Sequence, residues 1–148
     1  MHGNDAADDL AIATPWRVSL MAAAVAGLAA VFVFQQANWL QALISPAQNP
    51  NLFFVVQRVL RVLLNDACMT LLLVGWFASR NVFKMALILQ AIDLFILLPV
   101  YLAIKLSIEG NSEISSPLLS QFHRLIVNPT LLILLIPAVY FQRFSNKA

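Results

Sequence analysis

Charged residues are scarce in this sequence. Asp, Glu, Lys and Arg together make up 11% of its 148 residues, whereas soluble globular proteins carry about 25%. The nine Lys and Arg residues outnumber the seven Asp and Glu residues only slightly, and they are spread along the chain. Nucleic-acid binding needs a clustered basic surface, so a small and scattered excess of positive charge excludes that class of partner.

Cysteine and metal-binding motifs are also lacking. Cys68 is the single cysteine, which excludes an internal disulfide and cysteine-rich zinc or iron–sulfur sites. It lies in an apolar segment, where a thiol is typically an unreactive packing group. The histidines, His2 and His123, are too few for a metal set, and the sequence contains no H-E-x-x-H, P-loop or G-x-G-x-x-G motif. We therefore expect no catalytic residue, metal or cofactor, and a protein that is not an enzyme.

Hydrophobic residues, in contrast, make up 61% of the chain, against about 45 to 50% in soluble proteins. They are concentrated in four runs, each near the roughly 20 residues that a helix needs to cross a bilayer, at about 18–34, 53–77, 82–104 and 125–142. We expect a polar N-terminal tail at 1–16, a short amphipathic turn at 39–44 and an outer loop at 105–123 that carries Lys105. The sequence predicts an all-α fold: one domain, 1–148, formed by an integral membrane bundle of four transmembrane helices.

The charges at the span ends predict the topology. The chain begins with acidic residues, unlike a cleaved secretory signal, so we expect the first span to be retained. The side of the membrane that holds the N-terminus would carry Arg17, Arg80, Lys84, Arg143 and Lys147. The opposite side would carry Arg58, Arg61, Lys105 and Arg124. The positive-inside rule then predicts that both termini are cytoplasmic.

Polar residues inside the second and third runs are candidates for function, because ionisable groups within a membrane are costly. Arg58, Arg61 and Asn65 are spaced i, i+3, i+7, which places them within about a 60° arc of one helix face. Asp66 and Asp93 each lie about 16 Å along their helices from the inner boundary, near the middle of the membrane.

Three interpretations of these residues stay open. In the first, they satisfy one another. Asp66 pairs with Arg61 or Arg124, which reach inward. Asp93 forms a hydrogen bond with Thr70 or Gln90. The intramembrane polar set would then be Asp66, Thr70, Gln90 and Asp93. In the second, the arginines and His123 form a site on the outer face for a carboxylate, a phosphate or an acidic loop. In the third, the two acids form a proton or ion pathway.

Three short motifs resemble a known family. Arg61-Val-Leu-Leu-Asn65 is similar to an R-x-x-L-N motif. The segment Arg124–Pro129 is similar to R-F-L-I-x-P, and the segment Ile136–Gln142 is similar to I-P-A-x-Y-x-Q. These motifs occur in this order in the exosortase-system-associated small membrane proteins of Bacteroidetes, the kind named for exosortase F and exosortase X. The resemblance covers about 53–142. Asp66 departs from it, because a small or apolar residue is expected there.

The resemblance implies a non-catalytic accessory subunit in the bacterial inner (cytoplasmic) membrane. Its partners would be membrane lipids and either an exosortase-like membrane transpeptidase or the substrate of that enzyme. An outward-facing arginine cluster would dock the enzyme or its substrate. The protein could also form a homo-oligomer. From the stripe and the motifs together, the expected partner- or anion-binding residues are Arg58, Arg61, Asn65, Arg124 and Asn128. The alternative is a small transporter or channel-like component that uses Asp66 and Asp93.

Overall fold

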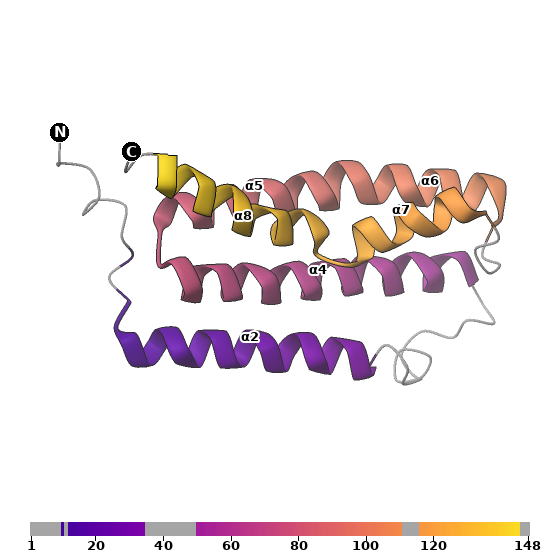
Figure 1. The fold of residues 1–148 in the computed structure, drawn as a ribbon. Coiled ribbons are helices and arrows are strands. Elements are labelled where there is room, and N and C mark those ends of the chain that lie inside the picture. Colours follow the sequence, from indigo (N-terminus) through magenta and orange to yellow (C-terminus); the bar gives the residue numbers. More distant parts are fainter. Residues whose placement is uncertain (1–9, 11, 35–49, 111–115, 146–148) are drawn as a thin grey trace.

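The computed structural model describes residues 10, 12–34, 50–110 and 116–145 (Figure 1). Helices account for 91% of these residues, and no β-strand occurs among them, so the predicted all-α fold is confirmed. The elements are α2 (Thr14–Phe34), α4 (Pro50–Phe77), α5 (Arg80–Ile92), the π-helix η1 (Asp93–Leu97), α6 (Leu98–Ile108), α7 (Pro117–Val127) and α8 (Thr130–Ser145). The predicted turn at 39–44 and most of the predicted tail lie outside the described residues.

Three helices are long and apolar enough to cross a membrane, so the chain is a membrane-spanning protein. They are α2, α4 and the continuous helix Arg80–Ile108, which comprises α5, η1 and α6. A fourth crossing is formed if α7 and the following Thr130–Gln142 count as one broken span, because the two pieces are bent by 62°. The bundle therefore has three or four crossings, depending on how this bent pair lies in the bilayer.

Helix α2 packs mainly against α4 and runs antiparallel to it. In Figure 1 it lies along one side of α4, and the remaining helices lie on the other side. Arg17 Nε donates to the carbonyl of Gly75 over 3.0 Å, and Arg17 Nη2 donates to the carbonyl of Trp76 over 2.7 Å. These bonds satisfy carbonyls in the last turn of α4, which have no partner within the helix.

Two glycines allow α2 and α4 to approach closely. A Cβ atom on Gly75 would lie 2.8 Å from Met21 Cγ and 3.2 Å from the carbonyl oxygen of Arg17, and one on Gly27 would lie 2.6 Å from Cys68 Sγ. Small residues at helix contacts are a common way to pack transmembrane helices, since lipid supplies no hydrophobic drive between them.

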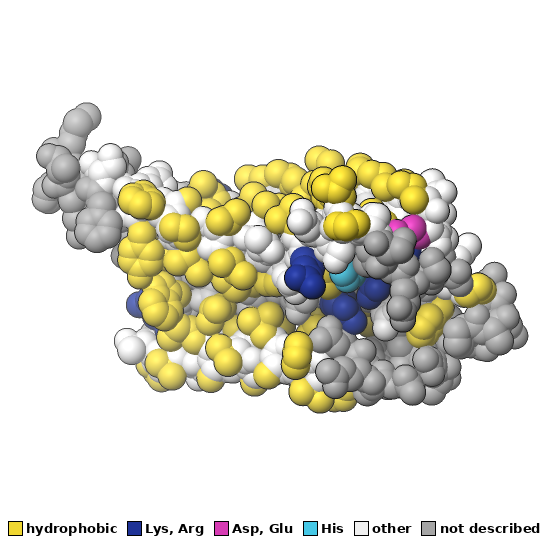
Figure 2. Space-filling view, turned by 45° about the vertical axis from the view of Figure 1, so that its right-hand side comes forward, with side chains coloured by type: hydrophobic (Ala, Val, Ile, Leu, Met, Phe, Trp, Pro, Cys, Tyr) yellow, Lys and Arg dark blue, Asp and Glu magenta, His cyan; other side chains and the backbone are white. Residues whose placement is uncertain are grey.

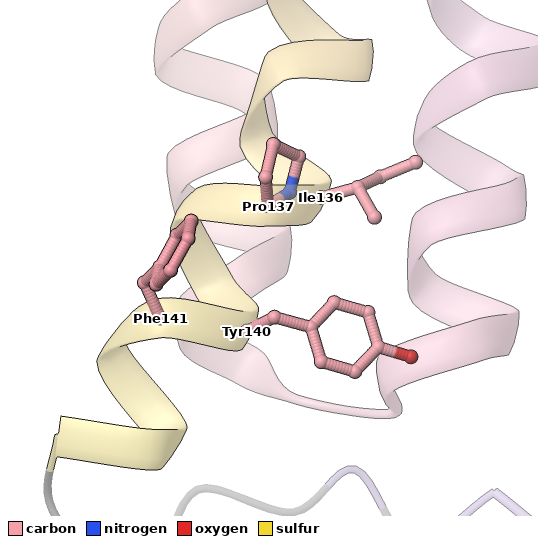
Figure 3. A pocket seen from close by; sticks show the side chains of 4 residues that line it. All are labelled: Ile136, Pro137, Tyr140 and Phe141. Atoms are coloured by element: carbon pink, nitrogen blue, oxygen red, sulfur yellow. The ribbon is translucent and has the colours of Figure 1, made fainter.

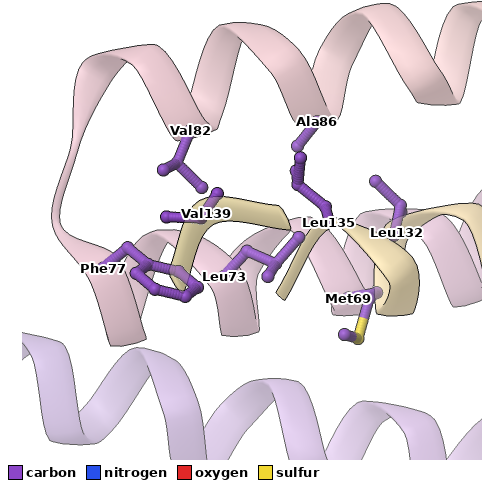
Figure 4. Packing of buried hydrophobic residues seen from close by; sticks show 8 residues of the cluster. All are labelled: Met69, Leu73, Phe77, Val82, Ala86, Leu132, Leu135 and Val139. Carbon is purple, nitrogen blue, oxygen red and sulfur yellow. The ribbon is translucent and has the colours of Figure 1, made fainter. Parts of the chain in front are cut away.

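Two apolar clusters hold the other helices together, and α4 belongs to both. The first joins α4, α5 and α8 through Met69, Leu73, Phe77, Val82, Ala86, Leu132, Leu135 and Val139 (Figure 4). The second joins α4, α6 and α7 through Val62, Leu98, Tyr101, Leu119, Ile126 and Val127. The bent pair thus contributes one of its halves to each cluster.

Helix α7 corrects the sequence-based boundaries. Residues 105–123 were expected to form an outer loop, but α6 continues to Ile108 and α7 already begins at Pro117. Ser116 caps α7, because its Oγ accepts a hydrogen bond from the N–H of Leu119 over 3.2 Å. A proline at the first helical position is also favourable. Asn128 ends α7, and α8 begins at Thr130.

The end of α8 forms a shallow apolar hollow beside an internal proline. Ile136, Pro137, Tyr140 and Phe141 line a volume of about 380 Å³ (Figure 3). The Tyr140 hydroxyl accepts a hydrogen bond from Trp76 Nε1 over 3.0 Å. Ligand sites usually combine an apolar lining with several convergent polar groups, and this lining supplies only one hydroxyl, which is already bonded.

The close approach of α2 and α4 is testable by filling the space at Gly75. Gly75→Val should destabilise the protein by about 1 to 3 kcal/mol, as overpacking a close contact typically does, because the new side chain meets the backbone of α2. Ala67→Val, at an exposed position of α4, is the matched control and should change stability little. Thermal unfolding in detergent compares them. Equal stability of the two variants would show that α2 does not lie against Gly75.

Candidate functional site

Basic side chains from three helices gather around His123. The Tyr101 hydroxyl and His123 Nδ1 lie 2.9 Å apart, and their ring centroids are 5.6 Å apart. Four basic groups are close enough to act electrostatically on the imidazole ring: Arg58 and Arg61 from α4, Lys105 from α6 and Arg124 from α7. We call these four residues with His123 the basic cluster. Arg61 and Arg124, which begin two separate sequence motifs, therefore both act electrostatically on the same side chain.

The basic cluster is open to the outside of the bundle. Figure 2 shows Lys and Arg side chains gathered next to a histidine on one face, with hydrophobic side chains over much of the surrounding surface. His123 is the one histidine among the described residues. Arg124 is exposed, whereas Arg58, Arg61 and His123 are half-buried. A ligand can therefore reach the cluster from one side, while neighbouring side chains partly shield it from water.

Arg58 carries an unused donor within this cluster. Its Nε atom is buried and has no hydrogen-bond partner, and its Cζ lies 4.9 Å from the centroid of the Phe54 ring. Stacking on an aromatic ring stabilises the cation but supplies no acceptor for the Nε–H group. A buried donor without an acceptor costs about 1 to 3 kcal/mol. An anion bound at the cluster would satisfy it.

Lys105 corrects another expectation. It was expected in the outer loop, but its side chain is completely buried on α6, and its Nζ lies 2.8 Å from Glu109 Oε2. Glu109 Oε1 also accepts a hydrogen bond from the N–H of Ser116 over 2.9 Å. One carboxylate thus neutralises Lys105 and ties the end of α6 to the start of α7. The i, i+4 spacing of Lys105 and Glu109 on a helix was the sequence signal for this pair.

The other acids do not neutralise the arginines. Among the described residues the only salt bridge is Lys105–Glu109, so the expected pairing of Asp66 with Arg61 or Arg124 is absent. Asp66 and Asp93 therefore form no ion pair with the arginines of the cluster. Within the described residues, the three arginines have no ion-pair partner. Charges held near a low-dielectric surface attract counter-ions strongly.

The expected polar pairing inside the bundle is also absent. The Oγ1 atom of Thr70 is buried and has no hydrogen-bond partner, and the same holds for Asp66 Oδ2 and Asp93 Oδ1. Among the described residues no side-chain hydrogen bond joins Gln90 to Asp93 either; the N–H of Asp93 bonds to the backbone carbonyls of Leu89 and Gln90, as in a helix. The sequence showed that these groups share the depth of the membrane, but it could not show that these buried oxygens form no hydrogen bonds with one another.

Asn65 links the two motif regions directly. Its Nδ2 donates to the backbone carbonyl of Val127 over 2.8 Å, at the break between α7 and α8. Asn128 contributes through its backbone: its N–H bonds to the carbonyl of Arg124 over 3.3 Å, and its carbonyl accepts from the N–H of Thr130 over 2.7 Å. The Asn65 bond therefore holds the end of α7, which carries Arg124, against α4, which carries the other two arginines. The backbone bonds of Asn128 set the geometry of the break between α7 and α8.

No family model, curated protein or solved structure matches the chain. The arrangement must therefore be interpreted from its own chemistry. Guanidinium groups with free donors bind carboxylates and phosphates, often through two parallel hydrogen bonds. In the described part of the chain no three His, Cys, Asp or Glu side chains come together as metal ligands would. The basic cluster is thus a candidate anion-binding site.

The buried Lys105–Glu109 pair predicts a specific stability pattern. Lys105→Met should lower the free energy of unfolding by about 3 to 5 kcal/mol, since removing one partner leaves a buried charge uncompensated. The double variant Lys105→Met/Glu109→Leu should recover part of that loss, because it removes the orphaned charge. Chemical unfolding in mixed micelles measures both. If the single variant is as stable as the native protein, Lys105 is a surface residue and the observed burial is wrong.

Proposed function

We propose that this protein is a non-catalytic accessory subunit of an exosortase-type protein-sorting system in the bacterial inner membrane. In this proposal the basic cluster docks the enzyme or its substrate. The sequence motifs support the family assignment. The main observation behind the proposal is that Arg61 and Arg124, each the first residue of a different motif, both lie close enough to His123 to act on it electrostatically.

A carboxylate on a partner protein is the anion that fits this proposal best. The cluster holds three arginines. The planar guanidinium group of an arginine can donate two parallel hydrogen bonds to the two oxygens of one carboxylate. Arg58 offers a buried donor without an acceptor, so part of the ligand would be bound away from water. Electrostatic interactions are stronger there than in bulk solvent. An acidic loop of the enzyme or of its substrate supplies such a group.

The proposed orientation puts the cluster outside the cytoplasm. With the N-terminus in the cytoplasm, α2 carries the chain outward and α4 returns from the outer side, which places Arg58 and Arg61 near the outer end of α4. The proposed arrangement leaves both termini in the cytoplasm, in agreement with the positive-inside rule. A translocated substrate would meet the cluster on the side where the sorting reaction takes place.

A small transporter or channel-like component is the second candidate. The observation that favours it is the burial of Asp66 and Asp93, which are 1% and 2% exposed and make no ion pair among the described residues. Unpaired intramembrane acids often mark ion pathways. Ion flux through liposomes that Asp93→Asn abolishes would favour this candidate over the accessory subunit.

Replacing arginines of the cluster by lysine tests the docking proposal. Arg61→Lys and Arg124→Lys keep the charge but lose the forked donor, so each should weaken association with the exosortase or its substrate about tenfold, the equivalent of one charge-assisted hydrogen bond. Quantitative co-purification from mild detergent measures this loss.

Arg80→Lys is the matched control for these variants. Arg80 is exposed at the start of α5, at the opposite end of α4 from the cluster, and its replacement should leave association unchanged. If all three variants co-purify as well as the native protein, the cluster serves only to anchor the bundle at the headgroups. If the exosortase never accompanies the native protein, the proposed partner is wrong.

A further inference from the structure

Three buried oxygen atoms near the middle of the bundle lack hydrogen-bond partners. They are Asp66 Oδ2 and Thr70 Oγ1 on α4 and Asp93 Oδ1 at the start of η1. The residues are 1%, 6% and 2% exposed. Buried polar atoms are nearly always satisfied in native proteins, so a group without a partner needs an explanation. Here three such groups occur, and two of them are carboxylates.

These three side chains face one region. Thr70 follows Asp66 by four residues, so it lies one turn further along the same face of α4. The π-helix η1 packs against α4, and the charge of Asp93 acts on Asp66. All three side chains are more than nine-tenths buried, so they face the interior of the bundle and not lipid.

The local backbone of the third span is also irregular here. The N–H of Leu98 bonds to the carbonyl of Asp93, one residue beyond the α-helical pattern, and Pro99 follows with no N–H to donate. Single π-turns inside helices occur frequently at functional sites. In transporters, sodium is typically bound where a transmembrane helix is interrupted, near the bilayer midplane.

We propose that Asp66, Thr70 and Asp93 form a binding site for one sodium ion between α4 and η1. The donor set consists of oxygen atoms, which hard cations prefer. The ion would bridge oxygens on two helices that do not reach one another through hydrogen bonds.

The site takes a monovalent ion in preference to a divalent one. Calcium requires six to eight oxygen ligands, and magnesium keeps several of its waters, whereas this site offers the side chains of two carboxylates and one hydroxyl. The sodium site does not depend on the docking proposal.

Sodium-dependent stability tests this site. The full-length protein in detergent would be unfolded thermally at increasing NaCl, with choline chloride keeping the ionic strength constant. A ligand that binds only the folded state raises its stability with concentration by mass action, so the midpoint should rise with NaCl. Direct binding is measured by the broadening of the ²³Na resonance in the presence of the native protein.

Two site variants and one control complete the experiment. Thr70→Val keeps both carboxylates and the side-chain shape, and should weaken sodium binding at least tenfold; Asp93→Asn should abolish it. Ser107→Ala removes a hydroxyl from an exposed position of α6 and should bind as the native protein does. Native protein with equal midpoints in sodium and choline and no ²³Na broadening would overturn the site. Broadening that Thr70→Val and Asp93→Asn leave unchanged would overturn it as well.

Discussion

The hydrogen bond from Asn65 to the carbonyl of Val127 is the interaction on which the arrangement of this bundle depends. Pro129 has no N–H, and the N–H of Thr130 turns back to the carbonyl of Asn128, so the last carbonyls of α7 lose their helical partners. Inside a membrane such carbonyls must be satisfied by the protein. The amide of Asn65 does this for Val127 and at the same time holds the α7–α8 break against α4.

The features of functional interest follow from this attachment, because α4 presents them in order along its length. Arg58 and Arg61 join Arg124 at one end, and the attachment of α7 brings these charges together. Asp66 and Thr70 lie in the next turns, and each has a buried side-chain oxygen without a hydrogen-bond partner. Gly75, near the last turn, accommodates α2. One helix thus carries the candidate anion site, the proposed cation site and the contact with the first span.

The sequence predicted those features that depend on local patterns. Apolar runs of spanning length identified the long helices, and the spacing of Arg58, Arg61 and Asn65 showed that they share a helix face. It did not predict α7, because its polar residues make an amphipathic helix look like a loop when only hydropathy is considered. The burial of Lys105 depends on the packing of α6 against α7, and the missing partner of Asp66 depends on distances between helices. Neither is encoded in residue spacing.

Pulsed electron paramagnetic resonance measures the central claim, that Asn65 holds the α7–α8 break against α4, most directly. Spin labels would replace Leu52 on α4 and Phe122 on α7, both exposed, in a Cys68→Ala background. We predict a narrow distance distribution that becomes broad or longer in Asn65→Leu, whereas Gln121→Leu, which replaces an exposed amide on α7, leaves it unchanged. An unchanged distribution in Asn65→Leu would contradict the account.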